Sequence, residues 1–365
     1  MAIQTIDFST IRTVIKDGID LTKVIFNGST IWEKILGWTQ IGDDIDGSQA
    51  GMFFGQSVAL STDGQTLVVG AHTFDVAYGQ VRVFKNTNET WTQIGQEING
   101  VYYRDQLGYS VDISSDGSII AIGAIGDSTV PGKVQVYQYI NNDWTQIGDD
   151  IAGEENSDIF GWSISLSDDG AIVAIGAPYH GNDNRGHVRV YEYSNSAWTQ
   201  IGGDITGAVQ GEQTGSSVDI SSDGTIVSVG AWYHDTNRGT VRVYQYSNSA
   251  WTQIGDDIDG EAAGDYSGYT VSLSADGTIV AIGASYNDDL AVRAGHVRVY
   301  QYSNSAWTQI GDDIDGEAQY DRSGEALSLI SDGTLDGTIV AVGAQFNNAA
   351  GGIDSGHVRV YNYLS

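Results

Sequence analysis

The chain has 365 residues, 41% of them hydrophobic, and its 47 acidic side chains outnumber 16 basic ones to give a formal net charge of −31. Lys and Arg contacts to phosphate supply much of nucleic-acid affinity, so this composition excludes nucleic acids and anionic membrane surfaces as favoured partners. No cysteine is present, which excludes disulfides, thiolate nucleophiles and cysteine-ligated metals. No stretch approaches the roughly 20 apolar residues of a membrane-spanning helix, so no membrane insertion is expected.

Residues 1–37 predict a small β arm. The segments "IRTVIKDGIDL" and "LTKVIFNGSTIW" each place a hairpin signal, Asp17-Gly18 or Asn27-Gly28, between short apolar runs. An isolated hairpin is marginally stable, so we expect the arm to anchor the protein to a partner. The apolar residues expected to make this contact are Val14, Ile15, Val24, Ile25, Phe26, Ile31 and Trp32. The first residues lack the apolar core of a secretory signal, which favours assembly in the cytoplasm.

Residues 38–365 consist of six copies of one unit. Each copy opens on a tryptophan, and these tryptophans are spaced by 53, 53, 54, 53 and 56 residues: Trp38, Trp91, Trp144, Trp198, Trp251 and Trp307. Self-similarity at this period indicates a repeat architecture.

Each copy predicts four short strands. In the fifth copy these are "WTQIGDDI" (251–258), "GYTVSLS" (268–274), "TIVAIGA" (278–284) and "GHVRVYQY" (295–302), which are rich in Val, Ile, Tyr and Thr and separated by turn residues. Ser-x-Asp-Gly, as at Ser274–Gly277, fits a tight hairpin turn between the second and third of them. The sixth copy carries a small insertion after Ser331.

These units must stack on one another, because "TIVAIGA" is apolar on both faces. Radial stacking of four-stranded antiparallel sheets predicts an all-β, six-bladed β-propeller. The first copy lacks a preceding "VRVY" strand and the last copy lacks a following tryptophan strand. We therefore predict that the N-terminal strand Trp38–Ile45 completes the last blade beside His357–Tyr363 and closes the ring.

The third copy contains "FGWSISLSDDGAIVAIGAP", with Phe160-Gly161 and Gly176-Ala177-Pro178. This resembles the FG-GAP repeat of integrin α-subunit propellers and of many bacterial, algal and viral surface proteins. The integrin-type repeat carries a D-x-D-x-D-G calcium loop between these landmarks, whereas this interval holds only Ser-x-Asp-Gly and does not predict Ca²⁺ there. The arm segment "KVIFNGSTIW" is similar to β modules near the N-termini of marine phage tail and decoration proteins.

The connections that differ between copies all fall on one face of the predicted propeller, where ligand binding is expected. The candidate ligand-binding residues on this loop face are Tyr179, His180, Trp232, Tyr233, His234 and Tyr286. Their aromatic rings could stack on sugars or enter a protein groove, or they could simply cover the blade tops. A metal site at the two histidines lacks an evident third ligand.

Acidic residues after the tryptophan strands form the second candidate site. A Ca²⁺ ion could be held by carboxylates drawn from Asp256, Asp257, Asp259, Asp265, Asp312, Asp313, Asp315 and Asp321. Alternatively, these residues cap turns or pair with arginines that recur between valines of the last strand, at Arg82, Arg189, Arg242, Arg298 and Arg359. No motif requires another cofactor.

No nucleophile–base pair or phosphate loop is evident, so no catalytic residues are predicted, although the many carboxylates leave a glycosidase centre open. The expected function is a non-enzymatic virion protein, a tail fibre, spike or capsid decoration, whose arm binds other virion proteins and whose loop face binds a host glycan or protein. The alternative is a secreted or cell-surface adhesion module that binds glycans or proteins with Ca²⁺.

Overall fold

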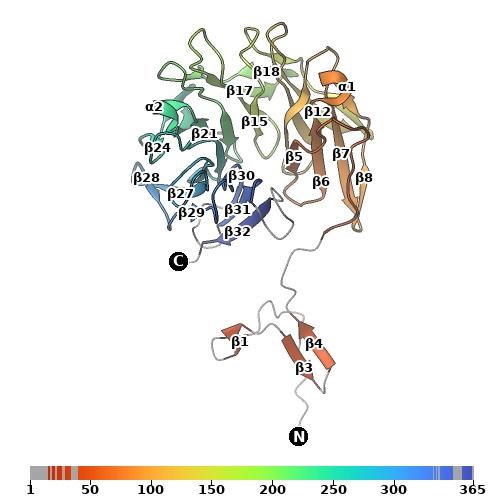
Figure 1. The fold of residues 1–365 in the computed structure, drawn as a ribbon. Coiled ribbons are helices and arrows are strands. Elements are labelled where there is room, and N and C mark those ends of the chain that lie inside the picture. Colours follow the sequence, from red (N-terminus) through yellow and green to blue (C-terminus); the bar gives the residue numbers. More distant parts are fainter. Residues whose placement is uncertain are drawn as a thin grey trace. The chain divides into compact units, whose positions relative to one another are not determined.

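A computed structural model gives the fold of the protein (Figure 1). It describes residues 40–331, 333, 335, 338–347 and 356–363, and the strands within residues 15–33. The chain divides into two compact units, residues 1–43 and 44–365.

The first unit contains two antiparallel hairpins. Strand β1 (Ile15–Lys16) pairs with β2 (Ile19–Asp20), and β3 (Lys23–Phe26) pairs with β4 (Ser29–Glu33). The pairs flank residues 17–18 and 27–28, as the two Gly-containing turn signals predict. Six of the seven apolar anchor residues lie in these strands, and Val14 lies outside the described residues.

The second unit is built from six antiparallel sheets, the blades, which follow one another around a ring (Figure 1). Blade 1 has β5 (Ser57–Leu60), β6 (Thr66–Ala71), β7 (Gln80–Thr87), β8 (Thr90–Gln93) and β9 (Ile98–Asn99). Blade 2 has β10 (Leu107–Ile113), β11 (Ile119–Ala124), β12 (Lys133–Ile140), β13 (Asp143–Gln146) and β14 (Ile151–Ala152). Blade 3 has β15 (Ser163–Leu166), β16 (Ile172–Ala177), β17 (His187–Ser194), β18 (Ala197–Gln200) and β19 (Ile205–Thr206).

The remaining blades repeat this order. Blade 4 has β20 (Ser217–Ile220), β21 (Ile226–Ala231), β22 (Thr240–Ser247), β23 (Ala250–Gln253) and β24 (Ile258–Asp259). Blade 5 has β25 (Thr270–Leu273), β26 (Ile279–Ala284), β27 (His296–Ser303), β28 (Ala306–Gln309) and β29 (Ile314–Asp315). Blade 6 has β30 (Ala326–Ile330), β31 (Ile339–Ala344) and β32 (His357–Asn362). Two four-residue helical turns, α1 (Phe74–Ala77) and α2 (His234–Asn237), lie between the second and third strands of blades 1 and 4.

The outer edge of blades 1 to 5 differs from the expectation. The sequence predicted one strand over "WTQIGDDI", but the structure forms two, β23 and β24 in the fourth blade. Gly255 between them has a φ of +72°, and this left-handed residue redirects the chain. As a result β23 pairs with the second half of β22, and β24 pairs with its first two residues.

The hydrophobic core lies between adjacent blades, as the two-sided apolar strands predict. Ile120 and Ile122 of β11 have no exposed surface, and Val68 and Val81 of blade 1 belong to the same core cluster. Five such clusters follow one another from blade 1 to blade 6. Each blade therefore depends on its neighbour for burial.

Hydrogen bonds also join the blades. The second residue of each Ser-x-Asp-Gly turn donates its backbone N–H to the matching carbonyl of the next blade, in bonds of 2.9 to 3.2 Å that link Thr62, Ser115, Asp168, Ser222, Ala275 and Ser331. Nearer the loop face, the Ser110 hydroxyl donates to the Gly161 carbonyl of the next blade at 2.7 Å. Four further hydroxyls make the same contact in other blades.

The two glycine landmarks of the repeat mark this blade–blade contact. A Cβ added to Gly176 would lie 2.1 Å from the carbonyl oxygen of Gly215 in the following blade. Gly215 itself has a φ of +90°. The repeat therefore needs glycine at both positions, the first for close approach and the second for its backbone conformation.

The interface between blades 6 and 1 is more open in the described part of the chain. Val58 and Leu60 of β5 are 58% and 54% exposed, and Val358 of β32 is 66% exposed. The counterparts of Val58 in blades 2 to 5 are 8% or 9% exposed. Of the predicted closing strand Trp38–Ile45, Trp38 and Thr39 lie outside the described residues and residues 40–45 form no strand, so ring closure by this segment stays a prediction.

Candidate functional site

The variable connections lie on one face, as predicted. The loop after β6 and the loop before β10 are joined by backbone bonds from Gly100 to Gly79 (2.9 Å) and from Gln106 to Ala77 (3.0 Å). The Ser-x-Asp-Gly turns and the hairpins after the third strands are joined separately, for example from Asn86 to Gln65 at 2.8 Å. The loop face and the turn face are therefore opposite ends of each blade.

A central cavity of about 390 Å³ is lined by the first strands of all six blades. Tyr109 and Tyr269 lie on its wall, next to the positive-φ glycines Gly108 and Gly268. Burial raises the pKa of Tyr269 to about 12 and raises that of Tyr109 as well. Both side chains are therefore neutral phenols at physiological pH.

Aromatic rings form a continuous row around the loop-face mouth of this cavity. Ring centroids are separated by 4.9 Å between Tyr109 and Trp162, 6.5 Å between Trp162 and Trp232, and 4.6 Å between Trp232 and Tyr269. The row comes from blades 2 to 5 and has tilted or edge-to-face geometry, which aromatic pairs prefer. We call these four residues the aromatic row.

Further rings extend the aromatic row outward. Tyr266 lies 5.5 Å from Tyr233 and 4.8 Å from Tyr286, measured between ring centroids. Tyr233 is 39% exposed, and Tyr286 lies under the guanidinium of Arg322 at 4.7 Å. A cation over a ring face holds that ring in a fixed orientation. The row and these three tyrosines together form an apolar surface with hydroxyl groups at its edge.

Four of the six predicted ligand-binding residues join this surface, because Tyr179 also lies 6.4 Å from Trp162. The two histidines do not. His180 Nδ1 lies 2.8 Å from Asp158 Oδ2, and His234 Nδ1 lies 3.3 Å from the buried carboxylate of Glu212. These imidazoles partner buried acids and are not a shared metal site.

Sequence reasoning missed Tyr109, Trp162, Tyr269 and Tyr266. The first three directly follow the first glycine landmark, where the other copies carry Gln56, Ser216 and Glu325. The sequence did contain a signal for these three residues, because the position after the first glycine landmark differs between copies while its neighbours repeat.

Some of the acidic residues that follow the tryptophan strands pair with the recurring arginines, which is one of the alternatives predicted from the sequence. Arg189 forms two bonds of 2.8 Å to Asp204, and Arg242 contacts Asp257 at 2.9 Å and also the buried Glu212. Other acids cap turns. Asp265 accepts the N–H of Ala262 and Asp321 that of Ala318, both at 2.8 Å. Asp259 pairs with Arg238 at 2.9 Å, and Asp256 and Asp312 are exposed.

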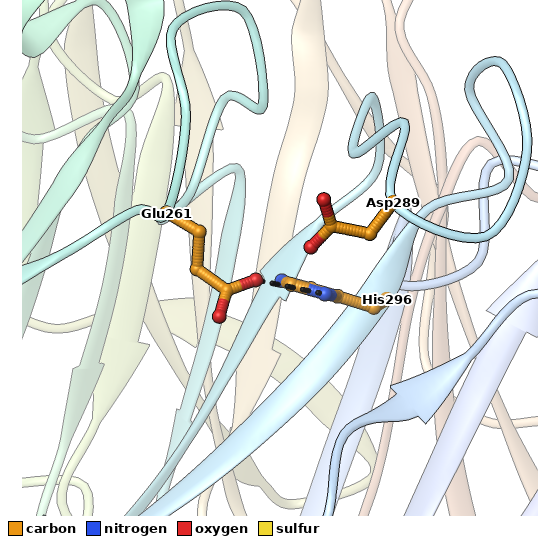
Figure 2. A group of neighbouring side chains, drawn as sticks. All are labelled: Glu261, Asp289 and His296. Atoms are coloured by element: carbon orange, nitrogen blue, oxygen red, sulfur yellow. Dashed lines mark ion pairs between the residues drawn. The ribbon is translucent and has the colours of Figure 1, made fainter.

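Asp313 and Asp315, by contrast, lie beside His296 at the start of β27. The ligand atoms of these three residues lie within 4.8 Å of one another, and so do those of His296, Glu261 and Asp289. Figure 2 shows Glu261 and Asp289 reaching from two different loops toward the imidazole of His296. We call these five residues the His296 cluster.

The fold belongs to the β-propellers. Similar folds are found in hydrazine synthase from Kuenenia stuttgartiensis (TM-score 0.53, 13% identity, covering 84% of this chain and 82% of that one). A protein from Lactobacillus plantarum is also similar (TM-score 0.54, 15% identity, covering 80% and 78%). At such identities the likeness concerns the fold alone.

No protein-family model and no curated protein matches the sequence, so the FG-GAP and phage-arm resemblances stay predictions. Among the residues that the structure describes, no helix has the length and apolar character needed to cross a membrane.

Proposed function

We propose that the protein is a non-enzymatic attachment module that binds a glycan at the aromatic mouth of its central cavity. The observation that carries this proposal is the aromatic row with its neighbouring tyrosines, which come from four blades and meet on the variable loop face. Aromatic faces stack on the C–H faces of sugar rings, while hydroxyl and amide groups at the edge bind sugar hydroxyls.

Polar groups lie beside these rings. Asn237 donates from Nδ2 to the Tyr266 hydroxyl at 3.2 Å, and Trp232 donates from Nε1 to Gln213 at 2.8 Å. The formal net charge of −31 repels sulfated and sialylated chains. The proposed ligand class is therefore a neutral glycan.

The test is binding of the full-length protein to a glycan array, followed by calorimetry with the best neutral ligand. Tyr233→Ala and Tyr286→Ala remove rings from the surface, and we expect each to weaken binding at least tenfold, about 1.4 kcal/mol. Tyr320→Ala is the control, because Tyr320 is an exposed tyrosine (51%, against 39% for Tyr233) that lies outside the aromatic surface. Absence of any neutral ligand, or equal effects of all three substitutions, would contradict the proposal.

We propose further that residues 1–37 anchor the propeller to a virus particle through other virion proteins. The separate compact unit with its two hairpins supports an anchoring role, and the glycine landmarks at Gly161 and Gly176 support an FG-GAP relationship. Mass spectrometry of purified particles should detect the protein. Deletion of residues 1–37 should abolish its incorporation, and unchanged incorporation would refute the anchoring role.

A secreted or cell-surface adhesion module is the second candidate, and the carboxylates near His296 favour it. This alternative requires Ca²⁺ for the binding of a glycan or a protein. The same calorimetric titration in the presence of EDTA distinguishes the two, since stacking at the aromatic row needs no ion.

A further inference from the structure

His296 is a buried imidazole without a hydrogen-bond partner. Its side chain is 1% exposed, and within the described residues neither Nδ1 nor Nε2 forms a hydrogen bond. Leaving a buried polar group unpaired destabilises the folded state. Its Nδ1 faces Glu261 Oε2 at 3.8 Å and Asp313 Oδ2 at 3.7 Å, which is too far for a hydrogen bond.

Carboxylates converge on this nitrogen from three segments. Glu261 follows β24 and Asp289 lies in the loop between β26 and β27, and both point toward the imidazole (Figure 2). Asp315 of β29 stands directly opposite His296 in the antiparallel register. Within the described residues, His296 is therefore shared by two groups of possible metal ligands, one with Glu261 and Asp289 and the other with Asp313 and Asp315.

The local charge is unbalanced. Four carboxylates lie near two guanidinium groups: Arg298 lies 3.8 Å from Glu261 Oε1, and Arg359 donates to the backbone carbonyl of Asp315. Burial, and then the neighbouring Asp289, raises the pKa of Glu261 above its ordinary value. Burial lowers the pKa of His296, so the imidazole is neutral and offers a lone pair. A cation is the missing component of such a group.

Blade 2 shows how the repeat satisfies the same position with a built-in cation. Lys133 occupies the register position of His296, and its Nζ lies 3.2 Å from Asp150 and 3.8 Å from Asp105. Asp150 and Asp313 each follow their blade's tryptophan by six residues. Blade 5 keeps the carboxylates but replaces the ammonium with a neutral imidazole.

We propose that the His296 cluster binds one divalent transition-metal ion, such as Zn²⁺ or Mn²⁺. A mixed set of imidazole nitrogen and carboxylate oxygen suits these ions, whereas Ca²⁺ takes oxygen ligands. Zinc–ligand bonds of about 2.0–2.1 Å in a tetrahedron place ligand atoms about 3.4 Å apart. Within each three-residue group the ligand atoms lie within 4.8 Å of one another, so side-chain movements of up to about 1.4 Å would bring them to this spacing. The ion would tie two loops of the ligand-binding face to β27.

The experiment uses untagged full-length protein stripped with EDTA and titrated calorimetrically with ZnCl₂, MnCl₂ and CaCl₂. We expect one equivalent of Zn²⁺ or Mn²⁺ to bind and to raise the melting temperature, because an ion that binds only the folded state stabilises it. Co²⁺ provides a second readout, since nitrogen ligation shifts its visible absorption.

His296→Thr is the principal variant, because blade 4 carries Thr240 at the same register position and folds with it. This variant and Glu261→Gln should each weaken binding at least tenfold. His187→Thr is the matched control, since His187 is equally buried at this position of blade 3, where Thr206 stands in place of Asp315. Wild-type protein that binds no transition metal, or His296→Thr that binds it like wild type, would overturn the proposal.

Discussion

Asp112 of β10 illustrates how a single residue couples neighbouring blades. Its Oδ2 accepts the backbone N–H of Leu166 in the next blade at 2.6 Å, and Asp219 bonds Leu273 in the same way at 2.6 Å. Burial raises the pKa of Asp112 to about 7, because few groups there compensate the charged form. The bond therefore joins neighbouring blades through a group that is protonated over much of the acidic range.

This shifted pKa predicts a definite pH dependence. Above about pH 4 the unfolded carboxyl loses its proton while the folded one keeps it, so the free energy of unfolding falls from about pH 4 to about pH 7. Asp112→Asn removes this titration and keeps an acceptor oxygen. The variant should melt at a higher temperature than wild type at pH 8 and at nearly the same temperature at pH 4.5, as measured by calorimetry. A difference that does not change with pH would contradict the assignment.

Asp63 is a control for this effect, because its pKa is shifted in the opposite direction. Bonds from the Ser61 hydroxyl and the Gln65 N–H hold its pKa below the ordinary value. Its charged form therefore stabilises the turn above about pH 4, and this contribution is lost as the pH falls. Asp63→Asn should lower the melting temperature at pH 8, and the loss should shrink on acidification.

At the scale of strands, the tight contact between blades predicts that alanine substitutions at different glycines change the free energy of unfolding by very different amounts. Gly176→Ala places a Cβ 2.1 Å from the Gly215 carbonyl and 2.3 Å from the Ser163 hydroxyl oxygen, so β16 must move away from blade 4. We expect a loss of about 2–3 kcal/mol in the free energy of unfolding. Gly203→Ala meets no atom within 4 Å and should be neutral or slightly stabilising. Urea denaturation measures both, and equal effects would argue against close packing as the reason for the landmark.

The strand pattern was largely predictable because each copy of the repeat carries local sequence signals for its strands and turns. The tryptophan spacing and the Ser-x-Asp-Gly turns predict six blades and the loop face correctly. The division of "WTQIGDDI" was not predicted, since it depends on the backbone conformation of Gly255 and on pairing with a strand upstream. The ring contact between Tyr109 and Trp162 was not predicted either, because these residues are 53 positions apart in the sequence and meet only when blades 2 and 3 stack.

For the whole molecule, we predict that the ring closes through its own N-terminal segment. Trp144 donates from Nε1 to the Ile94 carbonyl of the preceding blade at 3.1 Å and covers Gly95. Trp198, Trp251 and Trp307 make the same bond at 2.9 Å. Among the described residues, blades 2 to 5 are thus each fastened to the preceding blade by the tryptophan of their own outer strand.

The end of blade 5 offers the matching site. Ile310 and Gly311 line a hollow of about 170 Å³ together with Tyr361 and Tyr363 of the last blade. Of the described side chains, only Tyr363 approaches Gly311, with a ring carbon 3.8 Å from where a Cβ would lie. By the repeat register this hollow corresponds to the place of a tryptophan one copy further on, and Trp38 is the tryptophan left over.

A disulfide trap tests closure most directly, because the natural chain contains no cysteine. In blade 5, Gln301 pairs with Thr308, so the same register predicts that Asn362 pairs with Thr39. Paired strand residues have Cβ atoms about 4.5–5.5 Å apart, within reach of a disulfide after small adjustments. The control pair is Thr39→Cys with Gln301→Cys, whose partner Thr308 already occupies the neighbouring strand position.

Mild oxidation of the native Thr39→Cys, Asn362→Cys protein, followed by intact-mass analysis and a non-reducing gel, is therefore the decisive measurement. We expect a monomer that loses two hydrogens and migrates faster, while the control pair stays reduced. Free thiols in the Thr39–Asn362 pair, or a disulfide formed only between two molecules, would contradict a ring that closes within one chain.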